Sequence, residues 1–192
     1  SLNIAEHTAV RLADVVSMSY GFDNPNETPD ELNYDATYNV PGVTFLGATG
    51  DRGAPSSYPE YSPYVVAVGG TTLQNLDAQG GYPGTGTDGE VGWGGSAGGY
   101  SSYEPEPSYQ QSVQQSGYRS NPDISAVADP ATGVGVYDPY DISTLAPWIQ
   151  VGGTSLSSPM MAGMFAIVDE GRMLNGGGPF SSAMGGEMRD SM

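Results

Sequence analysis

The sequence has no cysteine, a single histidine and very few basic residues. The absence of cysteine excludes a disulfide framework and a thiolate metal site. Only 5 Lys and Arg stand against 22 Asp and Glu in 192 residues, so the formal net charge is −17. This balance argues against a nucleic acid partner and against docking on an anionic membrane surface. It suits an acidic or extracellular medium, in which carboxylates become protonated.

Long apolar runs are also missing from the sequence. No stretch approaches the roughly 18 residues that a membrane span requires, and the first residues do not have the pattern of a signal peptide. The chain begins in the middle of a helical pattern, so we expect it to be a piece of a longer protein. Its length suits one compact domain, and apolar residues recur throughout despite 29 glycines and 15 prolines.

Periodicity and turn signals predict strands that alternate with helices. Helices are expected over 4–13, 28–39 and 158–172. Buried strands are expected over 14–22 and 42–51, further strands over 62–73 and 148–153, and two short strands inside 121–138. The Gly-rich and Ser-rich stretch 77–108 predicts long loops with short strands. This succession indicates an α/β fold with a mostly parallel sheet, in which sites gather at the carboxyl ends of strands.

Small residues follow four of these strands, and the last of the four stretches leads into a helix. "SMSYG", "GATGDRG", "VAVGG" and "VGGTS" would leave room for a ligand. In "VGGTSLSSP" the spacing places Ser155 at the mouth of the helix, with Pro159 expected in the first turn. Ser155 is either a helix cap or a nucleophile, and Ser157 or Ser158 could serve as the cap equally well.

Six ordered blocks between about 14 and 172 resemble the sedolisin family of serine-carboxyl peptidases. They are "VVSMSYGF", "GVTFLGATGDRGA", "YPEYSPYVVAVGGTTL", "AGGYSSYEPEPSYQ", "NPDISAVADPATGVGVYD" and "VGGTSLSSPMMAG". The resemblance implies a subtilisin-like three-layer α/β fold with a mostly parallel central sheet. It also implies cleavage of peptides at acidic pH.

The resemblance assigns the two catalytic residues of this chain. Ser155 becomes the nucleophile, with its backbone N–H at a helix N-terminus, where developing negative charge is stabilised. Asp51 in "GATGDRG" takes the place where subtilisins carry an oxyanion-hole asparagine. A carboxyl group donates to an oxyanion only when it is protonated, which suits an acid-active enzyme. The alternative for Asp51 is a Gly-Asp turn with a solvated carboxylate.

The same resemblance implies two walls for an extended substrate. One wall is the strand end "SMSYG", which could instead be only the end of a core strand. The other is the glycine-rich stretch "GWGGSAGGYSSY", which could instead be a flexible surface loop. Gly152 and Gly153 keep the approach to Ser155 free of Cβ atoms. The expected substrate-binding residues are Ser17, Ser19, Tyr20, Gly21, Gly98, Gly99, Gly153 and Thr154.

The catalytic base of the family has no match in this sequence. Sedolisins need a Glu-x-x-x-Asp helix, in which the two acids share one face. Here Glu6 is followed four residues on by Val10, and Asp14 is too far away. An ordinary subtilisin triad needs a histidine, but His7 does not match that family's motif and is expected on the surface. We expect the base pair upstream of this chain, which alone would be nearly inactive.

The calcium site of the family is not found either. Sedolisins coordinate Ca²⁺ through an Asp-Ile pair and a glycine loop after the serine, whereas Asp141-Ile142 precedes Ser155. The Asp/Gly loop at 85–90 is a weak alternative, because oxygen ligands suit calcium. No metal ligand is therefore assigned.

These observations predict a partial peptidase catalytic domain over 1–174, with its N-terminal part missing, and a flexible or frayed tail over 175–192. The expected function is that of a secreted or cell-surface, acid-active serine endopeptidase acting on peptides or proteins. It would be a monomer with an upstream pro-segment. The alternative is a catalytically dead cell-surface module that binds extended peptides.

Overall fold

The computed structural model describes residues 2–21, 27–75, 89–142 and 144–182 of the chain. The helices and strands are α1 (Leu2–Ala9), β1 (Val15–Met18), β2 (Thr44–Ala48), β3 (Val66–Leu73), β4 (Glu90–Gly92), β5 (Gly99–Pro105), β6 (Tyr118–Asn121), β7 (Ile124–Val127), β8 (Val134–Tyr137), β9 (Trp148–Val151) and α2 (Thr154–Leu174). Three 3₁₀ segments join them: η1 (Pro29–Thr37), η2 (Ser108–Gln110) and η3 (Pro130–Thr132).

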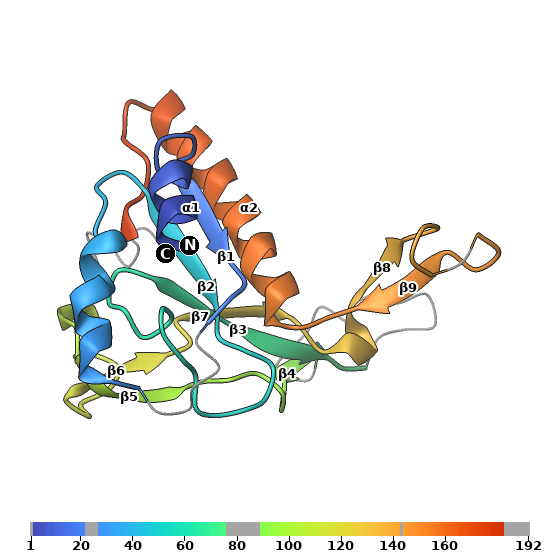
Figure 1. Cartoon of the computed structure of the whole chain (residues 1–192), viewed down its shortest axis with the longest axis horizontal. Coiled ribbons are helices and arrows are strands. Elements are labelled where there is room, and N and C mark those ends of the chain that lie inside the picture. The colour runs from blue at the N-terminus through green and yellow to red at the C-terminus, as the bar shows by residue number, and fades with distance from the viewer. Residues whose placement is uncertain (1, 22–26, 76–88, 143, 183–192) are drawn as a thin grey trace.

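The central sheet is mostly parallel, as the sequence predicts. β1, β2, β3 and β7 lie side by side in that order and all run parallel, while β4 pairs antiparallel with the end of β3. All of β2 and the first five residues of β3 are buried, which is typical of central strands in a sheet covered on both faces. β5–β6 and β8–β9 form separate antiparallel pairs, and β8–β9 projects from the body of the molecule (Figure 1).

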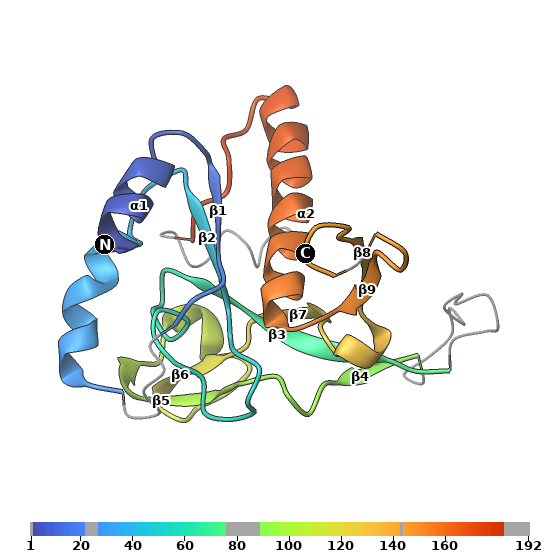
Figure 2. The same cartoon turned by 45° about the vertical axis from the view of Figure 1, so that its right-hand side comes forward.

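Helical segments cover both faces of the sheet and give three layers. Successive residues of a strand point to opposite faces, so Phe45 and Leu46 of β2 enter two different cores. Leu46 packs with Phe165 of α2, and Phe45 packs with Tyr38 at the end of η1. Figure 2 shows α1 and α2 on opposite sides of β1 and β2.

Helix α2 begins earlier than the sequence predicts. It starts at Thr154 rather than 158, so Pro159 lies in its second turn and not in the first. The cause is a long-range cap: Gly153 holds the N-cap position with φ 105°, and the Asp51 carboxylate accepts the Thr154 N–H. Such a cap comes from another strand end and leaves no signal in the local pattern.

Other elements differ in smaller ways. The expected helix over 28–39 is the 3₁₀ segment η1, in a stretch that contains the poor helix formers Asn33 and Asp35. The two strands expected inside 121–138 are β7 and β8, but only β7 joins the central sheet. Strands β4 and β5 lie within the loop region 77–108, of which 77–88 falls outside the described residues. None of the described helices has the length and apolarity needed to cross a lipid bilayer.

The described part of the expected tail packs on the core. The Phe180 ring contacts Phe165 with centroids 5.9 Å apart, and its N–H donates to Asp169 Oδ1 at 2.7 Å. The Ser182 hydroxyl accepts the Phe45 N–H at 3.2 Å. Residues 183–192 lie outside the described part, so the division between domain and tail stays a prediction.

Candidate active site

A pocket of about 120 Å³ opens where β1 and β2 end, beside the N-terminus of α2. This is the edge of a parallel sheet at which sites are expected. Its lining is mainly polar and comes from four separate stretches of the chain. The residues are Ser19, Tyr20, Gly21, Ala48, Gly50, Asp51, Ser57, Thr154 and Ser155.

Ser155 is the second residue of α2 and is exposed to the pocket. The helix N-terminus carries partial positive charge from its unpaired N–H groups. Pro159 has no N–H, so it cannot donate to the Ser155 carbonyl as an ordinary helical residue would. Ser155 therefore presents its hydroxyl to solvent from a rigid and electropositive helix end.

The hypothesis that a serine caps α2 is wrong. Gly153 holds the N-cap position and offers no side chain. The Ser157 hydroxyl donates to the Thr154 carbonyl at 3.1 Å, and Ser158 Oγ lies 3.1 Å from Ser17 Oγ on β1. The hydroxyl of Ser155 is thus not needed to cap the helix.

Asp51 supplies the cap and faces the same pocket as Ser155. Its Oδ1 accepts the Thr154 N–H at 2.7 Å and the Thr154 hydroxyl at 2.8 Å. The Gly50 N–H in turn donates to the Thr154 hydroxyl oxygen at 3.0 Å. A Cβ built on Gly153 would lie 2.7 Å from Asp51 Oδ2, so only glycine fits there. The Asp51 carboxyl is exposed and is held in position by these hydrogen bonds.

The strand end after β1 forms one wall of the pocket. Ser19, Tyr20 and Gly21 all line it, as expected for this stretch. The Tyr20 hydroxyl donates to Glu6 Oε1, which also accepts the Tyr38 hydroxyl at 3.0 Å. Burial and the neighbouring Glu6 raise the pKa of Tyr20, so its phenol stays protonated. Buried Glu6 therefore holds the pocket wall in place.

Four of the expected substrate-binding residues, Ser17, Gly98, Gly99 and Gly153, do not line this pocket, and Gly153 instead caps α2 behind Asp51. Ser17 turns toward Ser158 of α2. A Cβ on Gly98 would lie 2.9 Å from the Asn121 carbonyl oxygen, and Gly99 has φ 137°. These two glycines therefore serve the close approach of β5 and β6.

The glycine-rich stretch before β5 is nevertheless fastened beside the Asp51 loop. The Ala97 N–H donates to the Gly50 carbonyl at 2.9 Å, and the Gly53 N–H donates to the Gly95 carbonyl at 2.8 Å. Two backbone hydrogen bonds thus join the loop that carries Asp51 to the stretch expected to form the opposite wall. Whether this stretch binds a substrate stays a prediction.

Two features of the site had no clear signal in the sequence. Ser57 joins the lining from the segment between β2 and β3. Glu60, three residues on, is fully buried behind it, and burial raises the pKa of its carboxyl to about 8. Glu60 is an acid inside the otherwise mostly apolar block "YPEYSPYVV", and Ser57 directly precedes that block; this is the only signal that the sequence gives for them.

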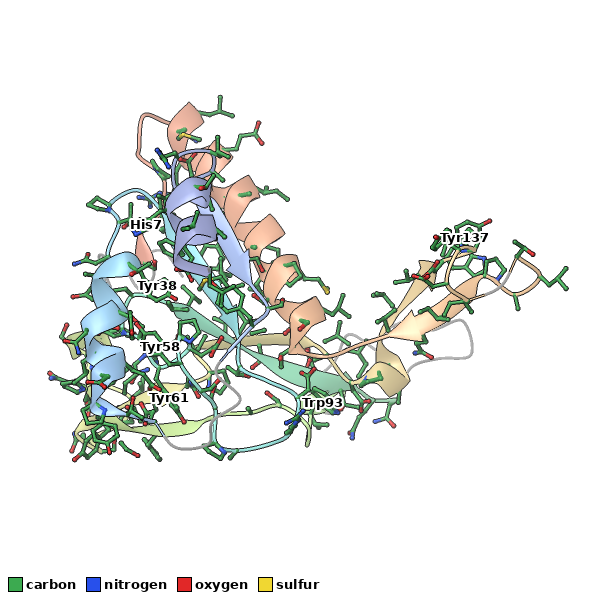
Figure 3. All side chains as sticks on the ribbon, in the orientation of Figure 1. His7, Tyr38, Tyr58, Tyr61, Trp93 and Tyr137 are labelled. Carbon is green, nitrogen blue, oxygen red and sulfur yellow. The ribbon has the colours of Figure 1, made fainter. Side chains whose placement is uncertain are left out.

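A second pair of acids, the half-buried Asp35 of η1 and the buried Glu104 of β5, lies between these two elements. The Glu104 and Asp35 carboxyls are hydrogen-bonded to each other, and the Tyr58 hydroxyl donates to Asp35 Oδ1 at 3.0 Å. Burial and Asp35 raise the pKa of Glu104 to about 8, and burial raises that of Asp35. Figure 3 shows Tyr38, Tyr58 and Tyr61 along the η1 side of the molecule.

The described residues do not provide a base for Ser155. Within them no hydrogen bond joins its hydroxyl to a carboxylate or an imidazole. His7 is exposed on α1 (Figure 3), and Glu6 is engaged by Tyr20 and Tyr38. No three His, Asp or Glu side chains gather into a candidate metal site in the part that the structure describes. Residues 85–88 of the weaker calcium candidate lie outside that part.

Comparisons with known proteins agree with this architecture. The model of the subtilase family matches residues 4–176. Sedolisin of Pseudomonas sp. (strain 101) is 34% identical over 198 residues, which cover 89% of this chain and 32% of the relative. Tripeptidyl-peptidase 1 of Rattus norvegicus is 33% identical over 165 residues, which cover 72% of this chain and 26% of the relative. The chain thus spans a third or less of these two relatives.

A solved structure shows the same fold. Pseudomonas sedolisin, a serine-carboxyl proteinase complexed with two molecules of pseudo-iodotyrostatin, has a TM-score of 0.71 and 28% identity. The match covers 99% of this chain and 57% of that one, and it confirms the expected subtilisin-like α/β fold. The chain therefore belongs to the subtilase family and, within it, to the sedolisin family of serine-carboxyl peptidases.

Proposed function

We propose that Ser155 is the nucleophile of an acid-active serine endopeptidase and that Asp51 is its oxyanion donor. The observation that carries this proposal is the shared pocket, in which an exposed serine hydroxyl at a helix N-terminus lies beside a fixed carboxyl group. The cap of α2 does not need the Ser155 hydroxyl, because Gly153 holds the N-cap position and Asp51 accepts the Thr154 N–H. The joint presence of Ser155 and Asp51 at the strand ends supports catalysis.

The chemical steps follow from these positions. Ser155 Oγ attacks the scissile carbonyl and forms an O–C bond, while its proton passes to a carboxylate base. The Ser155 N–H and protonated Asp51 donate to the resulting oxyanion. The C–N bond then breaks, the leaving amine takes the proton from the base, and water hydrolyses the acyl-enzyme.

We propose that the catalytic base belongs to a part of the protein outside this chain. This chain alone should retain only the residual rate that oxyanion stabilisation and positioning provide. We also infer that the whole protein is secreted or lies at the cell surface, and that it is a monomer made with a pro-segment. The strong excess of acidic residues supports an acidic working medium.

The test is turnover by the whole protein, with the residues that flank this chain. Hydrolysis of an internally quenched peptide library is measured from pH 3 to 7 for the wild type and Ser155→Ala. We expect activity at acidic pH and a loss of at least about 10³-fold in the variant. Ser112→Ala, on an exposed residue, is the matched control and should keep full activity.

Two results would contradict the proposal. Full turnover by Ser155→Ala would exclude Ser155 as the nucleophile. Tight peptide binding without turnover at every pH would instead support the alternative of a catalytically dead binding module. That alternative has its own motivation, since no base reaches Ser155 within the described residues.

A further inference from the structure

The hydrogen bond between the Glu104 and Asp35 carboxyls depends on a proton. An ionised carboxylate can only accept, so the two groups bond to each other only while one of them is protonated. The hydroxyls of Tyr58 and Ser62 both donate to Asp35, which favours the ionised form of that acid. Glu104 is therefore the member of the pair that donates, and the bond is lost when Glu104 ionises.

The surroundings of Glu104 act against its ionisation. Its side chain is 2% exposed, and its Oε1 has no hydrogen-bond partner among the described residues. Glu27 and Glu31, on the N-terminal side of the pair, add further negative charge. The Arg119 guanidinium also acts on Glu104, but it is paired with Asp123 at 2.5 Å. Burial and the neighbouring acids raise the pKa of Glu104 to about 8, because its ionised form would be a poorly compensated charge in the interior.

The pair fastens η1 to the body of the molecule. Asp35 belongs to η1 and Glu104 to β5. None of the nine residues of η1 is buried, so its attachment depends on polar contacts. Glu27, just before η1, makes another such contact, since its carboxylate accepts the Ser101 hydroxyl and the Ser102 N–H of β5. The η1 segment is thus linked to β5 through carboxyl groups near both of its ends.

The same end of η1 leads to the wall of the pocket. Tyr38 follows η1 directly, and its hydroxyl donates to Glu6 Oε1 at 3.0 Å. The same oxygen accepts the hydroxyl of Tyr20, which lines the pocket. Tyr58, which donates to Asp35, lies with its ring centroid 6.0 Å from that of Tyr38 (Figure 3). A displacement of this end of η1 therefore reaches the pocket wall through two hydrogen bonds to one carboxylate oxygen.

We propose that the Glu104–Asp35 hydrogen bond is an acid-closed latch, which holds the Tyr38 end of η1 on β5 in an acidic medium and releases it as the medium becomes neutral. On release Glu104 gives its proton to water, and the two carboxylates then repel each other. The pocket wall loses the support of Tyr38, while Glu27 still holds the other end of η1. The effect on peptide cleavage rests on the proposed function, because this is the pocket beside Ser155. The latch restricts that function to acid.

The test measures hydrogen exchange rather than turnover. The whole protein with Ser155→Ala is labelled at pH 5 and at pH 8, and each rate is corrected for the intrinsic rate at that pH. The amides of Tyr38 and Asn39, which close the last turn of η1, should lose at least tenfold in protection at pH 8, whereas those of β2 should keep theirs. Glu104→Gln still donates but cannot ionise, so the loss should shrink to less than threefold. Glu170→Gln removes an exposed charge on α2 and should follow the parent protein.

Each outcome decides one of the two proposals. Equal protection of the η1 amides at both pH values, or a loss that persists in Glu104→Gln, would overturn the latch. A loss that extends equally to β2 would also overturn it, because the whole domain would then be opening. The comparison of the two pH values needs no Glu104 variant, so it decides even if Glu104→Gln fails to fold. Turnover by otherwise wild-type protein that persists in Ser155→Ala would overturn the proposed function and leave the latch standing.

Discussion

Asp51 and Thr154 are 103 residues apart in the chain, yet one carboxylate oxygen accepts both the backbone N–H and the hydroxyl of Thr154. The pair joins the end of β2 to the start of α2. It fixes the acid beside Ser155 and satisfies an N–H that every helix leaves unpaired at its first turn. Asp51 therefore has a structural task that can be separated from its proposed catalytic task.

We first predict that Asp51→Asn separates these two tasks. The asparagine oxygen still accepts from Thr154, so the free energy of unfolding should change by less than about 1 kcal/mol. The amide needs no protonation to donate to an oxyanion, so the pH optimum for peptide cleavage should rise. Asp51→Ala should lose about 10²–10³-fold in kcat together with the cap. An unchanged pH profile in Asp51→Asn would argue against an oxyanion role.

The second prediction concerns the glycine before α2. Gly153 has φ 105°, and an added Cβ would lie 2.7 Å from Asp51 Oδ2. Gly153→Ala should lower the free energy of unfolding by about 1–3 kcal/mol and displace Asp51, with loss of activity. Gly163→Ala lies on the same helix with open space around it and should stabilise by up to about 1 kcal/mol. Urea unfolding of the two variants provides the comparison, and equal effects would contradict the prediction.

The third prediction is that Glu60 makes the protein more stable in acid. Below about pH 4.5 this carboxyl is protonated in both the folded and the unfolded chain and has no effect. Between that value and its folded pKa of about 8, only the unfolded chain ionises, so stability falls as pH rises. At pH 7 the loss is about 3 kcal/mol. Glu60→Gln should raise the Tm at pH 7 and leave it unchanged at pH 4.

Thermal melts over this pH range check the third prediction. Glu170→Gln on the exposed face of α2 is the control and should follow the wild type at every pH. If Glu60→Gln raises the Tm equally at pH 4 and at pH 7, then a change in packing, and not the ionisation of Glu60, causes the increase.

The fourth prediction is that the hydrogen-bonded carboxyls of Asp35 and Glu104 share a proton. The pKa of Glu104 is raised to about 8 and that of Asp35 is also raised, so folding retains protons that the unfolded chain releases above about pH 4.5. Glu104→Gln still donates to Asp35 but cannot ionise. We expect it to raise the Tm near pH 7.5 and to flatten the pH dependence. Glu104→Ala should lower the Tm at pH 4, because it removes the hydrogen bond. Equal melting curves for both variants would contradict the shared proton.

The fifth prediction is that Phe180 is part of the folding core. Its side chain is 3% exposed, it contacts Phe165, and the Arg172 guanidinium lies 4.2 Å from its ring centroid. Phe180→Ala should cost about 3–5 kcal/mol in unfolding free energy. Met173→Ala, at a side chain that is 48% exposed, should cost less than about 1 kcal/mol. If urea denaturation gives the same small loss of unfolding free energy for both variants, the segment after α2 contributes nothing to stability.

The sheet and the position of Ser155 could be predicted because both depend on local patterns. Apolar runs such as 42–51 mark buried strands, and small residues mark their ends. The start of α2 could not be predicted, because its cap comes from Asp51 on another strand. Phe180 follows a glycine stretch that indicates a loose tail, and only the core it enters makes it ordered. Glu60 was missed for the same reason, since its burial depends on strands far away in the sequence.

The long separation between Asp51 and Thr154 also sets the order of events during synthesis. β1 and β2 leave the ribosome before α2, which is made more than a hundred residues after Asp51. Contacts of such sequence separation form late, because the intervening chain must first be closed into a loop. If Ser155 is the nucleophile, a nascent chain without α2 contains the proposed oxyanion donor but not the proposed nucleophile. It would then stay inactive at least until α2 has been made and has docked on the sheet.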